Sequence, residues 1–166
     1  MIHNDVLRRL RYALDLDDAQ AIRLFALSGV ELDPTRLAAI LAREGADGFE
    51  SCTDRELGGF LDGLVLDRRG PRDPSAPAPR PTALDNNQIL KKLRIALKLE
   101  ERDMIAILNR GGMSVTPSEL GALFRNPGHK HYRACGDQLL RKFLDGLTHR
   151  LRPDAEATAR GDGDGA

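Results

Sequence analysis

The segment from His129 to Cys135 is the one place where metal-binding and nucleophilic side chains crowd together. It reads HKHYRAC, so His129 and His131 form a His-x-His pair with a cysteine four residues further on. This donor set suits a soft divalent metal. A structural zinc ion normally takes four ligands, however, and only Asp137 and the distant His149 are available as the fourth. The alternative is a basic surface loop with a buried cysteine.

The residues 83 positions earlier argue against both metal binding and cysteine catalysis. Cys52 matches Cys135, but Ala46 and Gly48 stand where the two histidines would be. A cysteine kept without its histidines indicates a small buried residue rather than a nucleophile. No Walker, Rossmann or catalytic-triad signature is present. We therefore expect no catalytic residue, metal site, cofactor or small-molecule substrate, and predict that the protein is not an enzyme.

The offset of 83 residues extends over most of the chain. It runs without a gap from Asn4 and Asn87 to Asp67 and Arg150, and its longest identical run, FLDGL, occurs at residues 60–64 and 143–147. Such a match at fixed spacing indicates an internal duplication.

Each copy is predicted to form four helices and no strand. In the first helix Asn4 is expected to be the N-cap, with Leu7, Leu10 and Leu14 on one apolar stripe, and Asn87 begins the same pattern in the second copy. The second helices cover about residues 17–27 and 101–110, and each is followed by glycine, which suits a C-terminal cap.

The third and fourth helices have clear start signals. Asp33 and Thr116 are each followed by proline, and Glu119 is expected to complete a capping box with Thr116. The fourth helices begin near residues 53 and 137. Gly63 and Gly146 lie inside them, where glycine costs about 1 kcal/mol relative to alanine, so we expect a close helix crossing at both.

These patterns define an all-α chain with two tandem four-helix modules joined by a proline-rich linker. The first module carries a net charge of −4 and the second +6. The linker is expected to be extended and the acidic, glycine-containing tail disordered. The predicted boundaries are 1–69 for the first module, 70–84 for the linker, 85–152 for the second module and 153–166 for the tail.

Three motifs carry a family resemblance. The segments NDVLRRLRYAL at 4–14, LKKLRIAL at 90–97 and HKHYRACGDQLLRKFLDGL at 129–147 resemble the bacterial YehS-like family, a domain of unknown function that occurs in tandem. The resemblance covers about residues 1–152 and implies a cytosolic bacterial protein. It implies no catalytic residue.

The excess of cations in the second module suggests binding to an anion or an acidic partner. A helix–turn–helix-like order at 17–43 and 101–125 is only superficial, because the turn is long and few side chains could read bases. The candidate binding residues are Lys91, Arg94, Lys98, His129, Lys130, His131, Arg133, Arg141 and Lys142.

Two functions remain open from the sequence. The favoured one is a non-catalytic adaptor that binds an unknown protein partner or self-associates, since modules of this size are marginal alone and gain by docking. The alternative is nucleic-acid binding through the basic second module. The sequence shows no membrane span and no signal peptide, so we expect a cytoplasmic location.

Overall fold

The computed structural model describes residues 1–75 and 83–153. The centre of the linker, 76–82, and residues 154–166 of the tail lie outside the described residues, so the extended spacer and the disordered tail stay predictions there.

Each half of the chain contains four helices, and the described residues contain no strand. The two sets of helices follow the offset of 83 to within one residue at every boundary, which confirms the all-α fold with two tandem modules. The helices are α1 (His3–Ala13), α2 (Asp18–Leu27), α3 (Pro34–Leu41) and α4 (Asp54–Arg69) in the first module, and α5 (Asn86–Ala96), α6 (Glu101–Arg110), α7 (Pro117–Leu123) and α8 (Asp137–Leu151) in the second.

Most of the predicted helix starts are present. The side chains of Asp33, Thr53 and Thr116 each accept a hydrogen bond from the backbone N–H three residues on. Thr53 and Glu56 form a complete capping box. The box predicted for Glu119 was wrong: its backbone N–H donates to Thr116 Oγ1, but its side chain does not return the bond.

The prediction that Asn4 caps its helix was also wrong. Asn4 lies inside α1, whose N-cap is Ile2, and Asn87 lies inside α5, whose N-cap is Asp85. Both asparagines are buried, at 1% and 8% exposure. Their amides are needed elsewhere in the fold, as described below, and this tertiary role outweighs the local preference of asparagine for helix starts.

The two modules share equivalent cores. Leu10 and Leu93 are fully buried at matching positions, and Phe60 and Phe143 likewise. The predicted close crossings are confirmed: a Cβ on Gly63 would lie 1.8 Å from the carbonyl oxygen of Leu24, and one on Gly146 would lie equally close to that of Ile107.

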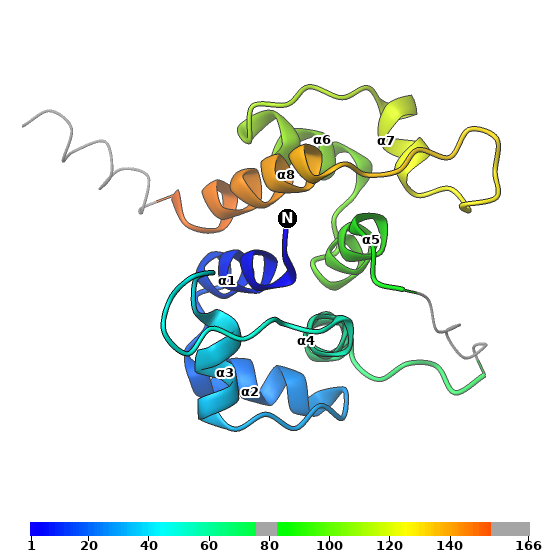
Figure 1. The fold of residues 1–166 in the computed structure, drawn as a ribbon. Coiled ribbons are helices and arrows are strands. Elements are labelled where there is room, and N and C mark those ends of the chain that lie inside the picture. Colours follow the sequence, from blue (N-terminus) through cyan, green and yellow to red (C-terminus); the bar gives the residue numbers. More distant parts are fainter. Residues whose placement is uncertain (76–82, 154–166) are drawn as a thin grey trace, which may run out of the picture.

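The two modules pack directly on each other. Helix α1 lies along α8, and α4 lies along α5, so these four helices form a central two-by-two group, with α2 and α3 on one side and α6 and α7 on the other (Figure 1). The offset of 83 exchanges these two helix pairs, so the modules are related by an approximate twofold axis. One continuous apolar core runs through both of them.

Ion pairs across this interface obey the same symmetry. Arg9 of α1 pairs with Asp145 of α8, and Lys92 of α5 pairs with Asp62 of α4, at positions that the offset exchanges. The N-terminal amine of Met1 also contacts Asp137 at the start of α8. Since residues 1 and 137 meet at one end and residues 9 and 145 further along, α1 and α8 run parallel.

Candidate functional site

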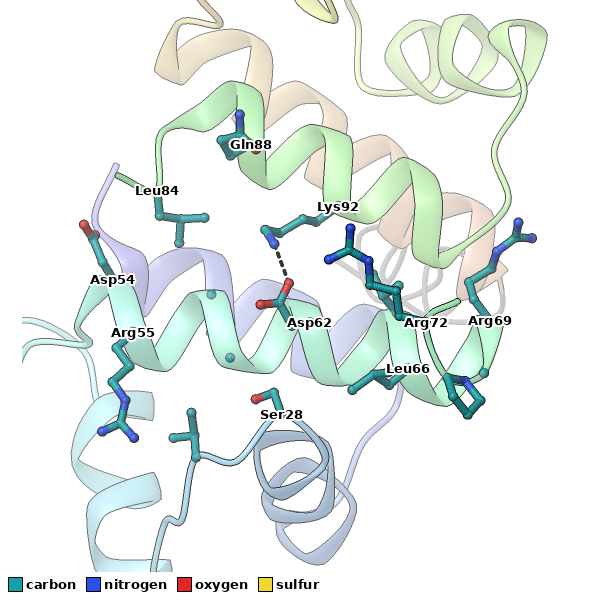
Figure 2. A pocket seen from close by; sticks show the side chains of 16 residues that line it. Ser28, Asp54, Arg55, Asp62, Leu66, Arg69, Arg72, Leu84, Gln88 and Lys92 are labelled. Atoms are coloured by element: carbon teal, nitrogen blue, oxygen red, sulfur yellow. Dashed lines mark hydrogen bonds and ion pairs between the residues drawn. The ribbon is translucent and has the colours of Figure 1, made fainter. Parts of the chain in front are cut away.

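A groove of about 980 Å³ lies over the outer face of α4. Helix α4 forms its floor, α5 forms one wall, the turn after α2 forms the opposite wall, and the first linker residues close one end (Figure 2). The groove therefore needs both modules in place. Its lining residues are Ser28, Val30, Asp54, Arg55, Gly58, Gly59, Asp62, Val65, Leu66, Arg69, Gly70, Pro71, Arg72, Leu84, Gln88 and Lys92.

Two adjacent glycines open the floor of the groove, for different reasons. A Cβ on Gly59 would lie 2.5 Å from Cγ2 of Val30, so Gly59 is required by the packing of α4 against the wall. A Cβ on Gly58 would meet nothing within 4 Å, and Gly58 has an ordinary helical backbone. A glycine in a helix interior costs about 1 kcal/mol relative to alanine. Neither packing nor backbone conformation explains why position 58 is a glycine.

The groove carries both charged and apolar side chains. Lys92 points across it to Asp62 and forms the interface ion pair (Figure 2). Asp54 is bound by His3 Nε2 at 2.5 Å. Arg55 and Arg69 are exposed and make no hydrogen bond or ion pair with any residue that the structure describes. With both carboxylates already partnered, these two guanidinium groups leave the groove electropositive.

The second module presents a different surface at the equivalent place. Arg141 and Lys142 stand where the first module has Gly58 and Gly59. In the second module the glycine at this close contact lies at the end of α6 instead of on α8: a Cβ on Gly111 would lie 1.9 Å from the carbonyl oxygen of Lys142. The duplicated halves have therefore diverged at this groove while keeping the same helix packing.

The two cysteines occupy a repeated structural site. Cys52 and Cys135 are both buried and free, as predicted. Each donates its backbone N–H to the side-chain oxygen of an asparagine: Cys52 to Asn4 at 3.0 Å and Cys135 to Asn87 at 2.8 Å. Burial raises the pKa of the Cys52 thiol to about 12 and that of Cys135 to about 11, which disfavours the reactive thiolate.

The same asparagines tie down the loop before the last helix of each module. The Asn4 amide donates to the carbonyl oxygens of Ile40 and Glu50, each at 2.9 Å. Asn87 makes the two equivalent bonds, to Leu123 and Arg133, at the same distance. Each amide therefore joins the end of the third helix to the loop that carries the cysteine.

A charged network in the first module lies next to this loop. The Arg36 guanidinium binds both carboxylate oxygens of Glu56, at 2.8 and 2.9 Å, and also contacts Glu50. These bonds lower the pKa of Glu56 to about 2. In the second module the exposed pair is reversed, with Glu119 at the position of Arg36 and Arg133 at that of Glu50, their charged atoms 3.9 Å apart.

The structure separates the nine predicted anion-binding residues into three segments. Lys91 and Arg94 lie on α5, and Lys98 lies just beyond its end. The Arg94 guanidinium lies 4.7 Å from the centroid of the Phe124 ring and donates to the Leu99 carbonyl oxygen. His129, Lys130, His131 and Arg133 lie in the exposed loop whose backbone Asn87 holds, and Arg141 and Lys142 lie on α8.

Most of these nine side chains are exposed. Arg94 and Lys142 are half-buried. Among the described residues Lys91, Lys98 and Lys130 make no ion pair, and none of the nine pairs with a carboxylate of the first module. Docking of the modules uses Arg9, Lys92 and their partners instead.

The His-x-His segment does not assemble a ligand cluster. His129 and His131 have ring centroids 5.6 Å apart, while Cys135 is buried against Asn87. In residues 1–75 and 83–153 no group of three or more histidine, cysteine or acidic side chains is placed to hold a metal ion. Over the same ranges no helix has the length and apolar character needed to cross a bilayer.

These features define a duplicated helical protein whose two modules are docked through an approximate twofold interface. Two separate regions of the chain, 3–70 and 86–152, match the model of the family described as "Protein of unknown function (DUF1456)", and the chain belongs to this family. It is 44% identical over 151 residues to "Uncharacterized protein YehS" of Escherichia coli (strain K12), covering 90% of this chain and 96% of that protein. No solved structure matches the chain.

The sequence analysis did not predict the groove, because the residue that indicates it differs between the two copies of the repeat. The repeat directs attention to identical pairs, whereas Gly58 is paired with Arg141. A glycine in the interior of a predicted helix, facing arginine in the other copy, is a signal that was available. The clamping role of Asn4 and Asn87 was hidden because asparagine near a helix start is usually a cap.

Proposed function

We propose that the protein is a non-catalytic, cytoplasmic interaction module that binds a segment of a partner protein in the groove over α4. The observation that carries this proposal is Gly58, a helix-interior glycine that the fold does not require and that leaves the floor of the groove open. Small residues let another backbone approach a helix closely.

The composition of the groove supports a macromolecular partner. Val30, Val65, Leu66 and Leu84 supply apolar surface, and charged side chains lie around them, which is the arrangement of protein-binding sites. The groove follows α4 over most of its sixteen residues, about 24 Å at 1.5 Å per residue. A surface this long suits a peptide segment better than a single small molecule.

Site-specific photo-cross-linking tests the proposal. A photoreactive phenylalanine derivative would replace Leu66 in the groove or, as the matched control, His149 at the equivalent position of α8. In cells that naturally make the protein we expect one discrete adduct from position 66, absent from position 149. The adduct should disappear when Gly58→Gln, which fills the floor with an uncharged side chain, is added. The proposal would be contradicted by identical adducts from positions 66 and 149, or by an adduct that still forms when Gly58→Gln is present.

Nucleic-acid binding by the second module is a second candidate, favoured by Lys91, Lys98 and Lys130, which are exposed and have no ion-pair partner in the part of the chain that the structure describes. Cations that neutralise phosphates give binding that weakens steeply with salt. A mobility-shift assay with mixed DNA and RNA would compare wild type with the Lys91→Gln, Lys98→Gln variant, leaving Arg94 in place because it packs on Phe124. Binding at low salt that falls in the variant supports this candidate, and no binding at low salt eliminates it.

A further inference from the structure

We infer that the groove over α4 takes an acidic, amphipathic α-helix, an inference that rests on the proposed function and specifies its partner. Three observations support it: the groove's cations that have no partner among the described residues, the helical backbone of its floor and one wall, and the asymmetry between the two modules.

The charge of the groove selects an acidic partner. Four cationic side chains line it against two carboxylates, and those carboxylates are held by Lys92 and His3. Arg55 lies near one end of α4 and Arg69 at the other, and both are exposed. Two guanidinium groups that have no partner among the described residues therefore flank the apolar floor. A segment with carboxylates towards both ends and an apolar middle would satisfy both.

The walls of the groove favour a helix over an extended peptide. A peptide that binds as a strand needs backbone donors and acceptors on the protein to pair with. The floor and one wall are helices α4 and α5, whose backbone groups are already used within each helix. A helix satisfies its own backbone bonds, so it can enter such a groove without losing any.

Gly58 then acquires a specific role. It lies between the exposed Arg55 and Asp62, one helical turn from each, and a Cβ there would point into open space. An incoming helix can approach α4 closely at this point. In α8 the equivalent Arg141 is exposed and carries a long, charged side chain at this position. The partner's helix therefore binds on the α4 side of the molecule and not on the α8 side.

Designed peptides of about 15 residues, the length of the groove floor, test the charge and the conformation separately. The probe has leucines along the middle of one helical face, glutamates at both ends of that same face, and glutamates on the opposite face. One control peptide replaces every glutamate by lysine, and a second keeps the acidic composition but contains two central prolines that prevent a helix. Binding to the full-length protein is measured by fluorescence anisotropy.

We expect the acidic helical peptide to bind about tenfold or more tighter than either control, and to weaken as salt screens the charges. Gly58→Gln should reduce its affinity about tenfold by filling the floor, whereas Arg141→Gln, the matched change on α8, should not. The Arg55→Gln, Arg69→Gln double variant should also lower the affinity about tenfold and flatten its salt dependence.

Tighter binding of the lysine peptide, equal binding of the proline peptide, or binding that ignores both Gly58→Gln and the arginine changes would overturn this inference. Binding of RNA that competes with the peptide and is lost in Gly58→Gln would overturn it in favour of nucleic acid. The two proposals fail separately: a Gly58-dependent cross-link from position 66 to a partner segment that is not acidic preserves the proposed function and refutes the acidic helix.

Discussion

Gly58 of α4 and Arg141 of α8 occupy equivalent positions of two modules that otherwise pack alike. The approximate twofold relation preserves the interface ion pairs, the buried asparagines and the close crossings at Gly63 and Gly146. Divergence at one exposed helix position therefore gives the two faces of the molecule different surfaces. Within residues 1–75 and 83–153, only the α4 face combines a helix floor without side chains at Gly58 with arginines that have no partner.

The glycines of α4 should respond oppositely to alanine. Gly58→Ala adds a methyl group that meets nothing and removes a poor helix former, so we expect the free energy of unfolding to rise by about 0.5–1 kcal/mol. Gly63→Ala forces a Cβ against the Leu24 carbonyl, and we expect a loss of about 1–3 kcal/mol or more. Urea unfolding measures both. A Gly58→Ala variant that is clearly destabilised would show that Gly58 is structural after all.

The buried Asn87 should contribute far more to stability than the half-buried Asn86 beside it. Asn87→Ala removes three hydrogen bonds and leaves the Cys135 N–H unpaired, so we expect a loss of about 2–4 kcal/mol. The control is Asn86→Ala, which removes bonds to the Cys135 carbonyl and Asp137 near the surface and should cost under about 1 kcal/mol. Equal losses in the two variants would refute the clamping role.

The sequence predicted those features of the fold that depend on local interactions. Helix existence and boundaries were predictable because caps, prolines and leucine spacing act within a few residues, and the repeat supplied every signal twice. The roles that residues play in tertiary contacts were not predictable in this way. The Asn4 amide reaches a carbonyl 36 positions away, and the groove combines α4 with α5 and the turn at Ser28. The unused signals were both comparisons between copies: Gly58 against Arg141, and Arg36–Glu50 against its reversed pair.

The Arg36–Glu56 pair should make stability depend on acid. Because Arg36 lowers the pKa of Glu56 from 4.5 to about 2, folding favours the ionised carboxylate. The stabilisation is then fully present above the unfolded-state pKa and is lost as the pH falls from about 5 to about 2. We expect Glu56 to contribute on the order of 2–3 kcal/mol to this loss.

Urea unfolding at about pH 7 and pH 3 would compare wild type with Glu56→Gln. The variant should be less stable near neutrality and should lose less stability on acidification. The same acid dependence in both proteins would show that other carboxylates cause it.

The modules should remain together without a continuous linker. A specific protease site inserted within residues 76–82 would allow the purified, folded chain to be cut. A continuous apolar core and two salt bridges join the halves. We therefore expect the cut protein to elute in size-exclusion chromatography as one particle near the 18.2 kDa of the intact chain. High salt alone should not separate it, since burial of apolar surface dominates the interface. Two separately eluting fragments would contradict the docked arrangement.

Calorimetric titration tests the central claim, that the open floor of α4 is a binding surface, most directly. The cross-linked partner segment, made as a synthetic peptide, would be titrated into wild type, Gly58→Gln and Arg141→Gln, with the unfolding free energy of each protein measured alongside. We predict that Gly58→Gln weakens binding about tenfold or more at undiminished stability, while Arg141→Gln binds as wild type does. Equal affinities for all three proteins, or a loss of affinity in Gly58→Gln that merely follows a loss of stability, would contradict the claim.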